Sequence, residues 1–128
     1  MVIIMNTYPW KKFFEIAIAA LGEGEMRLEN TKSFCAWTTF RNLQTDCHYW
    51  QAGLPRLSDL DDRGHKDWGI WRQPFDYNEL AHVIIPRTFV AGLIGEKQTQ
   101  NIDKLSELLK KEGLKHYCSD TVLEVKLY

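Results

Sequence analysis

The chain lacks most features that would identify a secreted, membrane-bound or disordered protein. Its 128 residues include only three cysteines and four prolines, and no low-complexity tract. An odd number of cysteines, in a chain without a recognisable signal sequence, predicts a reduced, cytoplasmic protein. No segment approaches the roughly 20 apolar residues that cross a bilayer as a helix. We therefore expect neither a disulfide framework nor a membrane partner.

Recognisable catalytic, cofactor and metal motifs are also missing. The sequence contains no glycine-rich phosphate loop and no serine nucleophile elbow. A stretch beginning at Asp59 matches the start of a calcium loop, but Arg63 and Ile70 occupy positions that require oxygen ligands. No histidine has a second ligand at helical or turn spacing. These absences predict a protein without a metal or cofactor, and they favour a non-catalytic function.

The charge of the chain is nearly balanced, with a formal net charge of -1 at pH 7. Proteins that bind nucleic acid usually carry a basic domain or stripe, because neutralising phosphates supplies much of their affinity. The densest run of lysines here, within residues 104–115, falls on or near a predicted helix and is typical of a solvated helix face. A nucleic-acid partner is therefore disfavoured, although a local basic patch is compatible with the sequence.

Length and composition predict a single globular domain over residues 1–128. The chain is 45% hydrophobic, 26% charged and 12% aromatic, which is typical of a folded protein. Helical and strand patterns alternate, and the strand pairs are mostly local. We therefore predict an α+β fold: an antiparallel or mixed sheet packed by an N-terminal and a C-terminal amphipathic helix, with a long irregular central segment.

Two segments have the three-and-four spacing of apolar residues that predicts an amphipathic helix. The first covers residues 8–21 and ends before Gly22. The second covers residues 102–112. It begins after Asn101, whose side chain is a favoured helix cap, and ends before Gly113. Both helices are expected to pack an apolar stripe against the sheet.

Strand-forming residues are concentrated in several short regions. The apolar run at residues 80–85 ends at Pro86 and predicts a strand that is buried on both faces. Residues 89–94 are apolar but do not distinguish a strand from a short helix, and residues 95–100 are predicted to be a polar connection. The remaining predicted strands cover residues 25–29, 33–40, 114–118 and 121–127.

The central segment, residues 41–79, keeps neither period for more than a few residues. We predict only a short helix at residues 46–52, ending at Gly53. Long irregular segments in compact domains are often functional. Between Asp46 and Glu79 the chain has seven acidic residues against four basic ones, and six large aromatic residues. This composition makes the segment the leading candidate for a binding surface.

The predicted function is that of a small binding protein without catalytic activity. Aromatic anchors beside unbalanced carboxylates are typical of surfaces that bind a basic partner. We expect an inhibitor or immunity-type protein that neutralises a basic protein such as a toxin or nuclease. The alternative for the tryptophans is that they fill a core beneath the central segment. The predicted contact residues are Asp59, Asp61, Asp62, Asp67, Trp68 and Trp71.

Two other functions remain open. A small hydrolase or nuclease-like enzyme would use His48, His82, Glu124 and Lys126, provided that these side chains meet in one cleft. Alternatively, the chain is a structural subunit that buries apolar loop surface in a homo-oligomer. The sequence does not distinguish a monomer from a homodimer.

Overall fold

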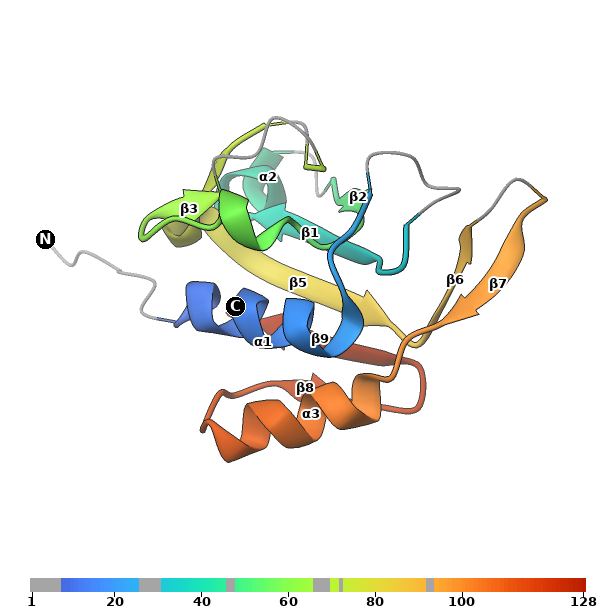
Figure 1. The fold of residues 1–128 in the computed structure, drawn as a ribbon. Helices are drawn as coiled ribbons and strands as arrows, with labels where there is room; N and C mark the ends of the chain where they lie inside the picture. Colours follow the sequence, from blue (N-terminus) through green and yellow to red (C-terminus); the bar gives the residue numbers. More distant parts are fainter. Residues whose placement is uncertain (1–7, 26–30, 46–47, 66–69, 72, 92–93) are drawn as a thin grey trace, which may run out of the picture.

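A five-stranded antiparallel sheet forms the centre of the fold (Figure 1). The computed structural model describes residues 8–25, 31–45, 48–65, 70–71, 73–91 and 94–128. The strands lie in the order β2-β1-β5-β9-β8, and every neighbouring pair is antiparallel. Helices and antiparallel sheets in one small unit confirm the predicted α+β class. The strands of this sheet are β1 (Cys35–Thr39), β2 (Trp50–Ala52), β5 (Leu80–Pro86), β8 (Tyr117–Cys118) and β9 (Val122–Lys126).

Two small hairpin sheets and several helices complete the part of the chain that the structure describes. In the first small sheet β3 (Gly64–His65) pairs with β4 (Phe75–Asp76), and in the second β6 (Thr88–Ala91) pairs with β7 (Glu96–Thr99). The β6–β7 hairpin extends away from the body of the molecule (Figure 1). The helices are α1 (Trp10–Leu21), α2 (Phe40–Thr45), α3 (Ile102–Lys111), and the short 3-10 helices η2 (Leu57–Asp59) and η3 (Tyr77–Glu79).

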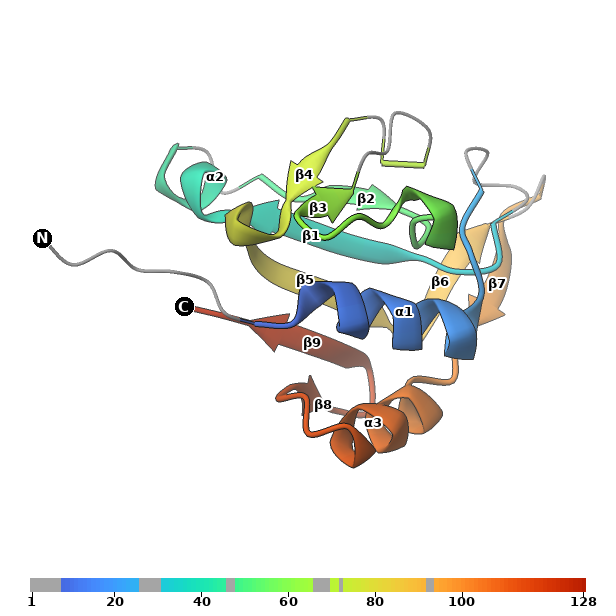
Figure 2. The same ribbon diagram turned by 60° about the vertical axis from the view of Figure 1, so that its left-hand side comes forward.

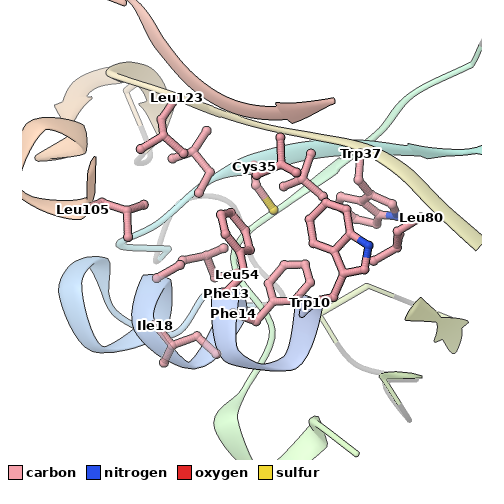
Figure 3. Packing of buried hydrophobic residues seen from close by; sticks show 14 of the residues in the cluster. Trp10, Phe13, Phe14, Ile18, Cys35, Trp37, Leu54, Leu80, Leu105 and Leu123 are labelled. Atoms are coloured by element: carbon pink, nitrogen blue, oxygen red, sulfur yellow. The ribbon is translucent and has the colours of Figure 1, made fainter. Parts of the chain in front are cut away.

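The main core lies between the central sheet and helix α1. In two views of the ribbon, α1 runs along the sheet beside β5 and β9, and α3 lies next to β8 (Figures 1 and 2). Trp10, Phe13 and Phe14 of α1 point toward β1 and β5 (Figure 3), and each is no more than 1% exposed. The predicted apolar stripe of this helix is therefore confirmed.

The strand register divides the central sheet into two faces, because residues directly opposite each other in an antiparallel pair share a face. Trp37, Val83 and Val125 are paired across β1, β5 and β9, and all three are buried toward α1. The neighbouring positions point to the opposite face. There the paired rows are Thr38–His82–Lys126 and Ala36–Ile84–Glu124.

The ends of the two long helices follow from local residues. Gly22 ends α1 with a φ of 96°, a conformation that other residues rarely adopt. At the start of α3 the Asn101 side chain accepts a hydrogen bond from the Lys104 amide, at 3.1 Å. Gly113, with a φ of 73°, follows this helix. The predicted cap and both predicted stops are confirmed.

Several strand predictions are also confirmed. Strand β5 covers the predicted run at residues 80–85, and most of its residues are buried whichever face they occupy. Strands β8 and β9 lie within the predicted strands at residues 114–118 and 121–127, and they pair as a hairpin in which Leu123 and Val125 are buried. Strand β1 lies within the predicted 33–40 region. Residues 26–29 of the other predicted strand lie outside the described residues.

Two predictions of local structure were wrong. The predicted short helix at residues 46–52 contains β2, because Trp50, Gln51 and Ala52 pair with β1; the helix in this region is α2, which begins at Phe40. The predicted polar connection at residues 95–100 contains β7, whose polar side chains stand on a hairpin paired with β6. In both places pairing with a neighbouring strand decided the conformation, and the hydrophobic pattern did not reveal it.

Candidate functional site

A cluster of polar side chains lies on the face of the central sheet that points away from α1. His82 on β5 and Glu124 on β9 are diagonal neighbours in the register, so their side chains meet across the strand pair. The His82 Nε2 atom and the Glu124 Oε1 atom are 3.0 Å apart. The His82 side chain is only 8% exposed, and that of Glu124 is 23% exposed. The carboxylate is therefore the more accessible end of this pair.

Two tyrosines extend the cluster from the other side of the imidazole. The Tyr49 hydroxyl is 2.7 Å from His82 Nδ1 and 3.1 Å from the Tyr128 hydroxyl. The Tyr128 hydroxyl is also 3.4 Å from His82 Nδ1. Tyr49 immediately precedes β2 and Tyr128 follows β9. These two strands lie on opposite sides of β5 in the strand order, so the two tyrosines reach His82 from opposite directions. We call Tyr49, His82, Glu124, Lys126 and Tyr128 the His82 cluster.

The protonation of His82 follows from its surroundings. Burial lowers the pKa of His82, although the hydrogen bond and the charge of Glu124 act in the opposite direction. A neutral imidazole has one N–H donor and one acceptor nitrogen, and a carboxylate only accepts. These roles assign the proton to Nε2, which donates to Glu124, and leave Nδ1 to accept from the Tyr49 hydroxyl. The result is a chain of carboxylate, imidazole and hydroxyl.

Lys126 completes the cluster, whereas His48 does not. Lys126 lies directly opposite His82 in the register, and its Nζ atom is 4.6 Å from the centre of the Tyr128 ring. The His48 ring instead lies 5.0 Å from that of Trp50, and its backbone carbonyl accepts hydrogen bonds from Thr38 and Asn42. Of the four residues predicted for an enzyme, the structure thus brings together His82, Glu124 and Lys126.

A pocket of about 470 Å³ adjoins the His82 cluster. Its volume lies within the range of about 300–1,000 Å³ that is usual for small-molecule sites. Glu124 and Lys126 line the pocket, so they belong both to it and to the His82 cluster. The other lining residues are Tyr8, Lys115, His116, Tyr117, Val125 and Leu127.

The predicted binding residues do not form the expected exposed aromatic surface. Trp71 is only 2% exposed: its ring stacks on that of Trp37 at 3.7 Å, and its indole N–H donates to the Gly53 carbonyl at 3.0 Å. The expectation that Trp71 is a surface anchor is therefore wrong, because this side chain fills the core and its only polar atom is bonded there. Asp67 and Trp68 lie outside the described residues.

The predicted acidic residues remain at or near the surface. Asp59 and Asp61 are half-buried, and the Asp61 carboxylate accepts the Asp62 amide at 2.8 Å. The Asp62 carboxylate lies 2.9 Å from the ammonium group of Lys11, yet the Asp62 side chain is 88% exposed. An internal cation therefore already balances part of this charge. Binding of a partner by these acids stays a prediction.

Metal and membrane sites can be assessed for the described part of the chain. It contains no group of three or more histidine, cysteine, aspartate or glutamate residues arranged to hold a metal ion. None of its helices has the length and apolar character that a bilayer crossing requires.

The two tyrosines of the His82 cluster were missed in the sequence. Tyr128 had a usable signal, because residues 124, 126 and 128 have the alternate spacing that places side chains on one face of a strand. Tyr49 had none, since it reaches His82 only through the pairing of β2 with β1 and of β1 with β5. No protein-family model, curated protein or solved structure matches this chain.

Proposed function

We propose that this protein is a small acid–base enzyme of the hydrolase or nuclease type, with Glu124 as the group that contacts the substrate. One observation carries the proposal: the hydrogen-bonded chain of Glu124, His82 and Tyr49, which begins at a residue that also lines a pocket. A carboxylate, an imidazole and a hydroxyl in hydrogen-bond contact are the groups that acid–base and nucleophilic enzymes align. This arrangement supports an enzymatic function better than the non-catalytic function that the sequence predicted.

The roles of the residues follow from their contacts. In the pocket, Glu124 accepts a proton from a water molecule or hydroxyl group that attacks an ester or phosphoester, and it then returns that proton to the leaving oxygen. Lys126, on the same face of β9, stabilises the negative charge that develops during attack. His82 is a positioning residue: it holds the Glu124 carboxylate through Nε2 and is itself held by the Tyr49 hydroxyl.

Replacing Glu124 by glutamine tests this proposal. The glutamine oxygen still accepts from His82, but the amide cannot take up a proton at neutral pH. The assay measures turnover of a short RNA, bis(p-nitrophenyl) phosphate and p-nitrophenyl acetate. For any substrate that the wild type cleaves, kcat/KM should fall about 10²–10⁴-fold in Glu124→Gln. The matched control is Glu96→Gln, an exposed glutamate on the β6–β7 hairpin, which should keep full activity.

Stability measurements separate catalysis from structural support. Glu124→Gln should unfold close to the wild-type midpoint, so that a loss of activity cannot be ascribed to unfolding. His82→Gln should shift the pH–rate profile in addition to lowering the rate, since His82 influences the group that takes up the proton. Wild-type protein that cleaves none of the three substrates, or a Glu124→Gln variant with full activity, would refute the proposal.

A second candidate is the binding protein predicted from the acidic segment, located in the cytoplasm. The observation in its favour is that the Asp62 carboxylate stays 88% exposed even beside Lys11, which leaves it accessible to a basic protein. Changing Asp59, Asp61 and Asp62 together to asparagine should slow association with a basic protein encoded by a neighbouring gene, chiefly at low salt. Glu96→Gln again serves as the control. Equal association rates for the wild type and the triple asparagine variant at low salt would refute this candidate function.

A further inference from the structure

The pocket beside the His82 cluster is lined on two sides by residues of mixed character. One side is strand β9, which contributes Glu124, Val125, Lys126 and the following Leu127. The other side consists of Tyr8, of Lys115 and His116 from the segment between α3 and β8, and of Tyr117, the first residue of β8. Apolar, aromatic, basic and acidic residues therefore line one volume of about 470 Å³.

Hydrogen bonds hold the wall of this pocket in place. The Tyr8 hydroxyl donates to the Lys115 carbonyl at 2.8 Å and so joins the start of α1 to the segment that follows α3. His116 is held on both ring nitrogens: Nε2 lies 2.7 Å from the Ser106 hydroxyl, and Nδ1 lies 2.9 Å from the Leu114 carbonyl. A pocket whose wall is fixed in this way loses little conformational entropy when a ligand enters.

Charge and aromatic surface restrict the kind of ligand that fits. Two lysines, Lys115 and Lys126, are among the residues that line the pocket, against one acidic residue, Glu124, whose carboxylate is hydrogen-bonded to His82. Lysine is a common phosphate-binding residue because it acts as a compact point charge. Tyr117 lines the same pocket and is 61% exposed, so its ring is available for stacking. Planar rings such as nucleobases stack on exposed aromatic side chains.

We infer that this pocket binds a phosphorylated ligand with a planar ring, of the nucleotide class. The phosphate lies near Lys115 and Lys126, the ring stacks on Tyr117, and a ribose hydroxyl faces the Glu124 carboxylate, which can only accept a hydrogen bond. This inference extends the proposed function by naming the substrate class of the same site. It requires no basic face over the whole molecule, since a mononucleotide needs only local cations.

Calorimetric titration with 5′-AMP tests the inference directly. AMP should bind with a Kd below about 1 mM, and adenosine and ribose 5-phosphate should each bind at least tenfold more weakly, because each lacks one of the two recognised groups. Comparable binding of ribose 5-phosphate would show an anion site without ring recognition and would overturn the inference. Absence of AMP binding at 1 mM would overturn it as well.

Variants locate the binding to this pocket. Lys115→Ala and Tyr117→Ala should each weaken AMP binding at least fivefold, and both should fold normally because their side chains are exposed. Lys97→Ala, at an exposed lysine on β7, is the matched control and should bind AMP as the wild type does. Unchanged affinity in both pocket variants would overturn the assignment of the site.

The outcome is distinguishable from a failure of the proposed catalytic function. The AMP titrations report ligand recognition through the wild type and the Lys115 and Tyr117 variants, whereas Glu124→Gln reports turnover. Turnover that depends on Glu124 without AMP binding would refute only the ligand class. Binding of AMP without turnover of any substrate would refute only the enzyme.

Discussion

Replacing His65 by leucine should make the stability of the protein much less sensitive to acid. His65 is 1% exposed and is surrounded by aromatic side chains. The centre of its ring lies 4.6 Å from the ring centre of Phe14, 4.3 Å from that of Trp71 and 5.4 Å from that of Tyr77. Neither ring nitrogen has a hydrogen-bond partner among the described residues. Burial among these side chains lowers the pKa of His65 to about 3.

The size of the effect follows from the difference between folded and unfolded pKa values. The unfolded chain binds a proton at His65 below a pKa of about 6.5, whereas the folded chain does so only below about 3. Acid therefore favours the unfolded state, and stability falls as the pH drops through 6.5 toward 3. At pH 5 the loss from this one group is about 2 kcal/mol relative to pH 8, at 1.36 kcal/mol per pH unit.

Urea denaturation at pH 8 and pH 5 measures this loss. The wild type should lose about 2 kcal/mol more than His65→Leu over this interval. Burial also lowers the pKa of His82, which adds an acid-sensitive contribution of the same sign to both proteins and leaves their difference unaffected. As a control, His48→Gln at an exposed histidine should behave like the wild type. Equal losses in the wild type and His65→Leu would refute the reasoning.

Two further predictions concern the core and a helix end. Trp71→Ala should lower the free energy of unfolding by about 3–5 kcal/mol, because it opens a cavity against Trp37 and leaves the Gly53 carbonyl without its indole donor. Urea denaturation measures this change, and a loss below about 1 kcal/mol would contradict the burial of this side chain. Asn101→Ala should lower the free energy of unfolding by about 1 kcal/mol, because it removes the cap of α3, and Asn101→Asp should retain most of the wild-type stability. Equal urea midpoints for the wild type, Asn101→Ala and Asn101→Asp would argue against the cap.

The sequence predicted the elements whose signals are local. Both long helices have apolar stripes, and their ends follow from Asn101, Gly22 and Gly113, which act on the neighbouring turn. Strand β5 was predicted from a continuous apolar run, because a strand that is covered on both faces needs apolar residues at every position. These features depend on side chains within a few positions of one another.

Features that depend on distant pairing were not predicted. Strand β2 exists because Trp50–Ala52 lies beside β1, and the polar strand β7 exists because β6 lies beside it. The location of Trp71 depends on the same kind of information, since its aromatic neighbours come from α1, β1 and β4. For the candidate site, the sequence suggested three residues of the His82 cluster as an alternative, but the tyrosines that hold the imidazole become neighbours only after the sheet has formed.

The strand order of the central sheet has a consequence for synthesis of the chain on the ribosome. Strand β5 pairs with β9, and Val83 and Val125 are opposite each other although about 40 residues separate them in the sequence. At translation rates of roughly 5–20 residues per second, the apolar β5 segment is without its partner strand for roughly 2–8 s, until β9 has been synthesised. During that interval one edge of β5 is open to other nascent chains, so the yield of native protein should depend on chaperones that shield this segment.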